Sequence, residues 1–121
     1  MGKTILTIDD SPSVRQMVQM TLSGAGYSVV EAVDGEDGLE KARAGRFDAV
    51  ITDQNMPRLD GIGFIRQFRQ LPSAMGVPVI FLSTESREDL KAEAKAAGAT
   101  GWMTKPFDHA TLLGVVKKVA G

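Results

Sequence analysis

The chain has 121 residues, of which 43% are hydrophobic, so its length and composition fit one compact domain with a single core. Fourteen basic side chains stand against fifteen acidic ones, and the resulting net charge of −1 argues against a nucleic-acid surface or a basic membrane-binding face. The absence of cysteine excludes disulfides, thiolate metal ligands and thiol catalysis. The first ten residues carry neither a signal peptide nor a membrane span, so we expect a cytoplasmic protein.

Short runs with strand character alternate with longer helical patterns from one end of the chain to the other. The expected strands cover residues 3–8, 27–32, 47–52, 77–83 and 100–104. The expected helices cover residues 12–23, 36–44, 62–71, 87–97 and 108–120. Five strand–helix units predict a parallel sheet with right-handed crossovers and helices on both faces, which is a doubly wound α/β fold.

The order of these elements also bears on the domain organisation and on the sheet. No linker or low-complexity segment interrupts the alternation, so we expect residues 1–121 to form one domain with no output domain. The runs around Ile5, Val50 and Ile80 are the most apolar, which predicts that the first, third and fourth strands lie inside the sheet. The second and fifth strands are better suited to its edges.

Polar side chains stand where four of the strands end. In chain order they are Asp9, Asp10, Asp53, Ser83, Thr84 and Lys105. Each has an ordinary explanation when taken alone, as a helix cap, a turn former, a loop hydroxyl or a solvated charge. Ligands of doubly wound sheets gather beyond the carboxyl ends of the strands, so we expect these side chains to share one rim.

Three carboxylates on one rim have an electrostatic cost. At a separation of about 4 Å they would repel by about 4 kcal/mol per pair at a surface-like dielectric. Lys105 neutralises part of this charge, and a shared proton or a hard divalent cation could neutralise the rest. Oxygen ligands without a nearby histidine or cysteine favour Mg²⁺ or Mn²⁺ over zinc. A carboxylate beside such a cation can act as a nucleophile toward phosphorus.

Four motifs, in this order and spacing, resemble those of response-regulator receiver domains. They are "IDD" at 8–10, "DQNMPRLDG" at 53–61, "FLSTES" at 81–86 and "KPF" at 105–107. The resemblance covers the whole chain and is strongest to the stand-alone receivers of the bacterial chemotaxis (CheY) type. It implies a flavodoxin-like (βα)₅ fold with strand order 2-1-3-4-5.

The resemblance also implies a metal site and a phosphoacceptor. Asp53 would accept the phosphoryl group. Asp10, Asp53 and the backbone carbonyl of Asn55 would bind magnesium, and Asp9 would assist through water. Asn55 also matches one of two positions that tune the lifetime of the phosphate in the family, and Glu85 matches the other.

Two further residues would bind the phosphoryl group itself. By the same resemblance, Ser83 would bond one phosphoryl oxygen and Lys105 would pair with another. The Lys105–Pro106 peptide bond is expected to be cis, as in the family.

The sequence departs from the common pattern of the family at two positions. Trp102 stands where the family usually has a tyrosine or phenylalanine that swings inward as part of the switch. Its indole either rotates or stays as a fixed part of the partner face, which the family builds from helix 4, strand 5 and helix 5. Thr84 stands where alanine or glycine is more common, and its β-branched side chain is expected to narrow access to the phosphoryl group.

These inferences favour a two-component signalling switch of chemotaxis, in which a histidine kinase is the phosphodonor. Such a protein is not an enzyme beyond its own Mg²⁺-dependent phosphorylation and dephosphorylation. We expect a monomer whose partners are the kinase, a target such as a flagellar motor switch, and a phosphatase, with no nucleic acid and no membrane. One alternative is a receiver that drains phosphate from the kinase. Another is an aspartyl-phosphate phosphatase, although that class usually has an acid where Asn55 stands.

Three basic side chains and the single histidine are expected to have ordinary solvated roles. Arg58, Arg66 and Arg69 form a modest basic surface around the third helix. His109 lies in the first turn of the last helix.

Overall fold

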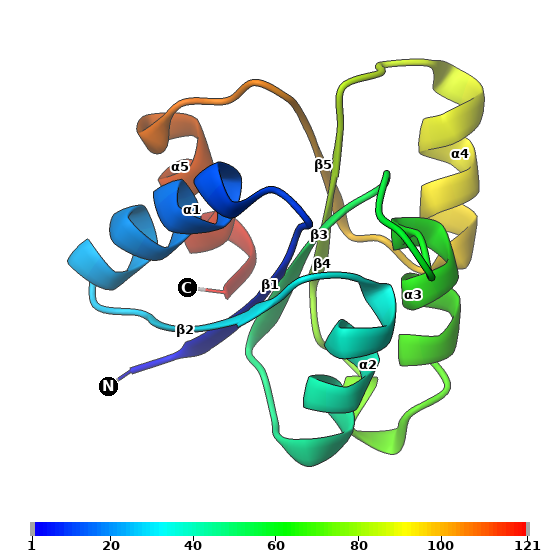
Figure 1. The fold of residues 1–121 in the computed structure, drawn as a ribbon, viewed down its shortest axis with the longest axis horizontal. Coiled ribbons are helices and arrows are strands. Elements are labelled where there is room, and N and C mark those ends of the chain that lie inside the picture. The colour runs from blue at the N-terminus through cyan, green and yellow to red at the C-terminus, as the bar shows by residue number, and fades with distance from the viewer. Residues whose placement is uncertain (1, 121) are drawn as a thin grey trace.

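The computed structural model describes residues 2–120, which form a five-stranded parallel sheet covered by helices on both faces (Figure 1). The strands are β1 (Thr4–Ile8), β2 (Ser28–Ala32), β3 (Ala49–Asp53), β4 (Val79–Ser83) and β5 (Gly101–Thr104). Their order across the sheet is β2-β1-β3-β4-β5. The fold class, the strand order and the placement of the most apolar strands inside the sheet are therefore confirmed.

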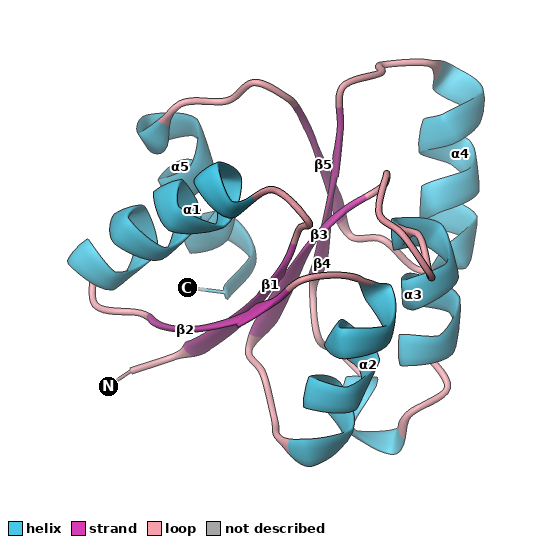
Figure 2. Ribbon diagram, viewed as in Figure 1, coloured by secondary structure: helices cyan, strands magenta, loops and turns pink. Residues whose placement is uncertain are grey.

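Five helices follow the five strands in turn (Figure 2). They are α1 (Pro12–Gly24), α2 (Gly35–Ala44), α3 (Gly61–Phe68), α4 (Glu88–Ala97) and α5 (His109–Ala120), with a short 3₁₀ helix at Pro72–Ala74. Helices α1 and α5 cover one face of the sheet, and α2, α3 and α4 cover the other (Figure 1). None of the helices among residues 2–120 is long and apolar enough to cross a bilayer.

Each face of the sheet has its own core. Val18 and Leu22 of α1 pack with Leu112 and Val116 of α5 on one face, and all four are fully buried. Phe64 and Phe68 of α3 stack at 5.4 Å on the other. Because β1, β3 and β4 carry apolar side chains on both faces, the strands that end at the acidic rim are held by packing from both sides.

The third helix is shorter than the sequence pattern predicts. The expected helix runs to residue 71, but α3 ends at Phe68. Leu71 adopts an extended backbone with φ −79° and ψ 137°, and Pro72 follows it. A proline disfavours helical geometry in the residue before it, so the apolar pattern continues after the helix has ended.

The register of the strands brings their carboxyl ends to one level. Asp53 is paired with Leu82, and Ser83 with Thr104. The Lys105 amide extends this pairing by donating to the Ser83 carbonyl at 2.8 Å. The ends of β1, β3, β4 and β5 therefore form the single rim that the sequence predicts.

Candidate functional site

Three residues at the centre of the rim are in direct contact. Asp9 follows β1 and is 1% exposed, and Asp53 ends β3 and is 6% exposed. The Lys105 Nζ atom lies 2.9 Å from Asp9 Oδ2 and 3.1 Å from Asp53 Oδ1. One ammonium group therefore joins two buried carboxylates from neighbouring strands.

A third carboxylate completes the acidic cluster. Carboxylate oxygens of Asp9, Asp10 and Asp53 lie within 4.8 Å of one another, and Asp10 is the exposed member. Within residues 2–120, Lys105 makes the only side-chain ion pairs with these three acids. Asp9 Oδ2 is buried and, apart from the approach of the ammonium, receives no hydrogen bond of good geometry. This cluster of carboxylate oxygens, whose negative charge exceeds the positive charge of one ammonium, fits a hard divalent cation such as Mg²⁺.

The pKa shifts at the rim show an excess of negative charge. Burial raises the pKa of the Asp53 carboxyl above its ordinary value of 3.8, and the negative charge of Asp9 raises it further. Lys105 and the backbone N–H of Gln54 oppose this rise without reversing it. Burial lowers the pKa of Lys105, but the carboxylates of Asp9 and Asp53 outweigh that effect and raise it above 10.5.

The hydroxyl expected at this rim is present and buried. Ser83 ends β4, is 1% exposed, and its Oγ accepts a hydrogen bond from the Glu85 amide at 3.0 Å. Its hydroxyl proton can still be donated to a ligand. Thr84, the next residue, is exposed.

The sequence comparisons agree with this geometry. Residues 5–117 match the family model of the response regulator receiver domain. This chain belongs to the response-regulator receiver family. It is 35% identical over 119 residues to the alkaline phosphatase synthesis transcriptional regulatory protein PhoP of Bacillus subtilis, covering 98% of this chain and 49% of PhoP. It is 33% identical over 113 residues to the transcriptional regulatory protein DltR of Streptococcus agalactiae, covering 93% of this chain and 50% of DltR. The chain thus spans about half the length of these curated relatives.

Solved structures are similar over nearly the whole receiver. The chemotaxis protein CheY4 of Vibrio cholerae has a TM-score of 0.95 and 44% identity, with 98% of this chain and 99% of CheY4 covered. The receiver domain of the sensor histidine kinase PA1611 of Pseudomonas aeruginosa has a TM-score of 0.91 and 28% identity, with 100% and 99% covered. That structure has a magnesium ion coordinated in its active site cleft. The resemblance to CheY-type receivers is therefore confirmed.

Two further predicted site residues lie in loops of the receiver around the rim. Asn55 is exposed on the loop between β3 and α3. Glu85 is exposed on the loop between β4 and α4, where its carboxylate pairs with Arg87 Nε at 2.9 Å. Asn55 is thus two residues from Asp53 in the chain, whereas the carboxylate of Glu85 is engaged by a neighbour in its own loop.

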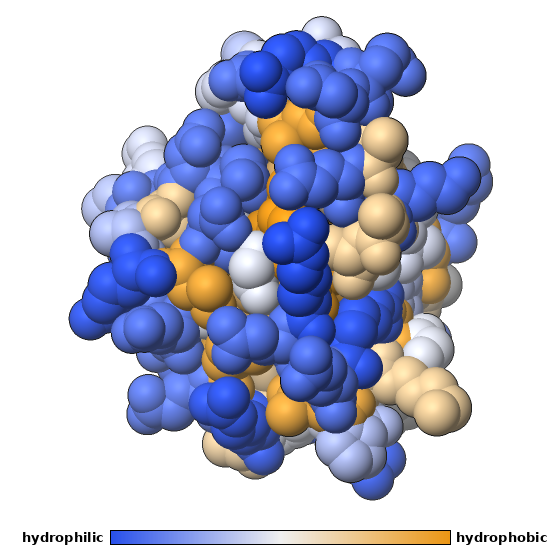
Figure 3. Space-filling model, turned by 90° about the vertical axis from the view of Figure 1, so that its right-hand side faces the viewer, coloured by the Kyte–Doolittle hydropathy of each residue, from blue (hydrophilic) through white to orange (hydrophobic). Residues whose placement is uncertain are grey.

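Trp102 belongs to β5, and its half-buried side chain packs beneath Lys91 of α4. Its ring centroid is 5.0 Å from that of Phe81 with a tilt of 48°, and Lys91 Nζ lies 5.4 Å from the indole centroid. The indole Nε1 donates to Thr104 Oγ1 at 3.3 Å. Figure 3 shows the side of the molecule that carries α3 and α4, where hydrophilic residues predominate and hydrophobic residues show as small patches between them.

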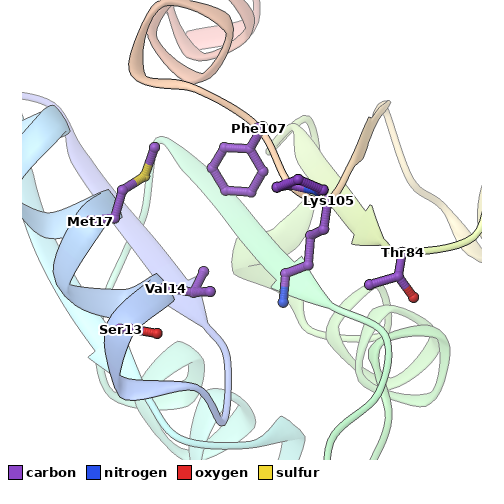
Figure 4. A pocket seen from close by; sticks show the side chains of 7 residues that line it. Ser13, Val14, Met17, Thr84, Lys105 and Phe107 are labelled. Carbon is purple, nitrogen blue, oxygen red and sulfur yellow. The ribbon is translucent and has the colours of Figure 1, made fainter.

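An open pocket of about 360 Å³ adjoins the rim between α1 and the loops that follow β4 and β5 (Figure 4). Val14 and Met17 of α1 face Phe107 across it, and Lys105 and Thr84 line the side toward the rim. The Lys105–Pro106 bond in this loop is cis, as expected. Thr84 therefore lines the pocket that adjoins the rim, and the residue is exposed.

Three side chains that were expected to be solvated have specific partners. The Arg58 guanidinium donates to the buried Asp34 carboxylate, with Nε 2.8 Å from Oδ2. The Arg69 guanidinium donates to the Gly98 and Ala74 carbonyls, with distances of 2.8 Å to each. His109 Nδ1 is hydrogen-bonded to the hydroxyl of Thr21. Arg58 and His109 are nevertheless exposed, as predicted, and Arg66 is exposed and approaches Glu93 at 3.5 Å. The prediction of a solvated role was wrong only for Arg69, which is partly buried.

Gln54 also has a role that the sequence did not reveal. Its side-chain Oε1 accepts from the Ile62 amide at 3.0 Å, and its Nε2 donates to Asp60 Oδ2 at 3.2 Å. Gln54 thus ties the end of β3 to the start of α3. A polar residue directly after Asp53 is the one signal in the sequence that could have indicated this contact.

Proposed function

We propose that this receiver is the phosphoacceptor of a two-component signalling pathway and that Asp53 accepts a phosphoryl group from a histidine kinase in a Mg²⁺-dependent reaction. The observation that carries the proposal is the cluster of three carboxylates within 4.8 Å that faces a single ammonium group. Such a site needs more positive charge than Lys105 supplies. A divalent cation and the transferred phosphoryl group together would use both the negative charge and the ammonium.

The metal would be held by this chain's own oxygens. Asp10, Asp53 and the backbone carbonyl of Asn55 would bind Mg²⁺, and Asp9 would assist through water. Mn²⁺ could take the same place because it accepts the same oxygen ligands. When bound, the cation would offset the repulsion between the carboxylates and the charge on the phosphoryl oxygens.

Phosphoryl transfer would follow from the placement of Asp53 on a rigid strand. A carboxylate oxygen of Asp53 forms a bond to phosphorus while the P–N bond of a phosphohistidine breaks, and the electron pair of that bond returns to the imidazole. The Lys105 ammonium, which lies 3.1 Å from Asp53 Oδ1, would hold one phosphoryl oxygen. The raised pKa of Asp53 would be offset once the cation binds, because its charge favours the ionised nucleophile.

The hydroxyl of Ser83 would connect the phosphoryl group to the partner face. If the Ser83 side chain rotates so that its Oγ moves toward a phosphoryl oxygen, the Glu85 amide loses its acceptor and the loop before α4 is released. Trp102 lies under α4 beside Lys91, so this release would alter the surface formed by α4, β5 and α5. Asn55 and Glu85 would tune the lifetime of the phosphate.

The output of the switch would be a change in protein binding on that surface. The likeness to CheY4, a chemotaxis protein, supports a target such as a flagellar motor switch. A receiver that drains phosphate from the kinase would use the same chemistry at Asp53 and would differ in having no target to bind. The two roles are separated by testing whether the phosphorylated form binds a motor-switch protein more tightly.

Trp102 fluorescence tests the proposed chemistry. Mg²⁺ and then acetyl phosphate or beryllofluoride are added to the wild type and to Asp53→Asn. We expect a Mg²⁺-dependent change and a further change with the phosphoryl source in the wild type, and loss of the second change in Asp53→Asn. A wild type that responds to neither addition contradicts the proposal. Repeated turnover of a phosphomonoester would instead identify a phosphatase.

A further inference from the structure

The loop between β3 and α3 is fixed at its base. The Gln54 amide donates to the Leu82 carbonyl at 3.0 Å, and the Gly61 amide donates to the Gln54 carbonyl at the same distance. A Cβ atom at Gly61 would lie 2.3 Å from the Asp53 carbonyl oxygen, so only glycine fits there. Residues 55–60 therefore form a loop whose two ends are hydrogen-bonded to each other directly after Asp53. We call this hydrogen-bonded base of the loop the neck.

The tip of the same loop is attached to the start of α2. Arg58 has φ 68°, a left-handed conformation that is unfavourable for a residue with a side chain. Its guanidinium donates to Asp34 Oδ2 through both Nε and a terminal nitrogen. The next residue, Leu59, accepts a hydrogen bond from the Gly35 amide at 3.2 Å through its carbonyl oxygen. We call the Arg58–Asp34 pair together with the Leu59–Gly35 hydrogen bond the latch.

The anchor of the latch, at the start of α2, is buried and hydrogen-bonded. Asp34 is 2% exposed, and its other oxygen, Oδ1, caps α2 by accepting from the Asp37 amide at 2.8 Å. A Cβ atom at Gly35 would lie 2.4 Å from the Leu59 carbonyl oxygen. The two carboxylate oxygens of Asp34 thus serve the helix and the loop separately, and the backbones of loop and helix approach as closely as glycine permits.

Asn55 lies between the fixed neck and the latched tip, three residues before Arg58. Because both ends of this short segment are held, the positions open to its carbonyl groups are restricted. We propose that Arg58 and Asp34 are positioning residues for the magnesium site, because the latch holds the loop that presents the Asn55 carbonyl. This inference rests on the proposed function, in which that carbonyl is a ligand.

The latch would also couple the metal site to α2. If the latched loop binds Mg²⁺ better than the free loop, then Mg²⁺ must stabilise the latch by the same factor. The Gly35 amide, which donates to Leu59, reports on the latch without belonging to the acidic rim. We expect its NMR signal to shift and its hydrogen exchange to slow when Mg²⁺ is added.

The test measures Mg²⁺ affinity by calorimetry in Arg58→Gly. Glycine adopts a φ of 68° without strain, so the fold is expected to tolerate this change while the ion pair is lost. We expect the affinity to fall about tenfold, the lower end of what loss of an outer partner costs a metal site. Removal of a positive charge would by itself strengthen Mg²⁺ binding, so a fall in affinity separates positioning from long-range electrostatics.

Three more variants complete the experiment. Arg58→Lys keeps the charge and should recover part of the affinity. Asp34→Asn keeps a good helix cap but loses the ion pair, and provides a second route to an open latch. Arg66→Ala removes an exposed charge from α3 without touching the loop, and its affinity should equal that of the wild type or exceed it slightly.

The outcomes distinguish this inference from the proposed function. Unchanged or tighter Mg²⁺ binding in both Arg58→Gly and Asp34→Asn, with a wild type that binds Mg²⁺ and is phosphorylated, overturns the latch and leaves the proposed function standing. A Gly35 signal that shifts equally with Mg²⁺ in the wild type and in Arg58→Gly also overturns it. A wild type that binds no Mg²⁺ removes the proposed function and the latch together.

Discussion

Two buried aspartates in this receiver show opposite pKa shifts for reasons that their surroundings explain. Burial raises the pKa of Asp53, the negative charge of Asp9 raises it further, and Lys105 is shared between both acids. Burial also acts to raise the pKa of Asp34, but the Asp37 amide and the Arg58 guanidinium together bring it below 3.8. The rim thus has more negative than positive charge, whereas the negative charge of Asp34 in the latch is matched by the positive charge of Arg58.

The difference shows how one fold can use the same side chain for structure and for chemistry. Asp34 has a hydrogen-bond donor for each of its two oxygens, so its negative charge stabilises the native state. Asp53 faces a second acid across one ammonium group, so its charge is a cost until a ligand arrives. Strand packing holds Asp53 in place despite that cost, which is the condition for a preorganised site.

The largest expected effect on stability comes from removing the Asp34 carboxylate, whose charge is matched by Arg58. Asp34→Ala removes the cap of α2 and leaves the Arg58 guanidinium without its buried partner. We expect the free energy of unfolding to fall by about 2 kcal/mol, the upper end for loss of a helix cap. Urea unfolding followed by circular dichroism measures this change.

The matched control for this prediction is Glu36→Ala. Glu36 also approaches Arg58, at 3.7 Å, but both side chains are mostly exposed in that contact. We expect almost no change in the free energy of unfolding. Equal losses in the two variants would show that the Arg58–Asp34 pair stabilises the fold no more than the exposed Arg58–Glu36 contact does.

A smaller change in the free energy of unfolding, of opposite sign, is expected when the charge of Asp53 is removed from the rim. In the absence of divalent cations, Asp53→Asn removes one of two adjacent negative charges and should raise the free energy of unfolding by about 1 kcal/mol. Added Mg²⁺ should stabilise the wild type and narrow or reverse the difference. Destabilisation by Asp53→Asn in EDTA would contradict the view that this charge is a cost.

Lowering the pH should remove both the stabilisation by the Asp34 charge and the destabilisation by the Asp53 charge. The folded-state pKa of Asp34 is lowered, so its stabilisation is present above 3.8 and is lost as the pH falls through the folded value. The folded-state pKa of Asp53 is raised, so its destabilisation is complete above that folded value, declines as the pH falls through it, and disappears below 3.8. Urea unfolding of wild type, Asp34→Asn and Asp53→Asn in EDTA, from neutral pH to about pH 3, measures both trends. Differences that stay constant with pH would show that ionisation is not their source.

The smallest effect on stability is expected at Thr84, which is exposed at the entrance to the rim. Thr84→Ala should leave the free energy of unfolding within about 0.5 kcal/mol of the wild type. It should nevertheless raise the rate of phosphorylation or of phosphate loss severalfold, because the β-branched side chain no longer narrows the approach. Quenched time courses with acetyl phosphate measure both rates, and unchanged rates in both directions would remove this role for Thr84.

The sequence was sufficient to predict the sheet and the rim because both depend on local patterns. Apolar runs placed β1, β3 and β4 inside the sheet, and the ends of parallel strands must share one edge. The sequence alone therefore predicts that the acids and Lys105 lie close together. The end of α3 was missed because the apolar pattern continues past Phe68, while the backbone responds to Pro72.

The partners of Arg58, Arg69 and His109 could not be predicted in this way. Asp34, Gly98 and Thr21 lie 24, 29 and 88 residues away from these side chains, respectively, so no periodic pattern connects them. Two of these contacts use backbone or hydroxyl oxygens, which carry no charge signal in the sequence. The latch in particular depends on the conformation of one loop, which propensities alone do not specify.

The most direct test of the central claim is to locate the phosphoryl group. The purified protein is incubated with acetyl phosphate in Mg²⁺ or in EDTA, and intact mass spectrometry is followed by reductive trapping and peptide mapping. We expect one base-labile phosphoryl group on Asp53, formed in Mg²⁺ and not in EDTA, and none on Asp53→Asn. A phosphoryl group on another residue, or equal incorporation in EDTA, would contradict the account.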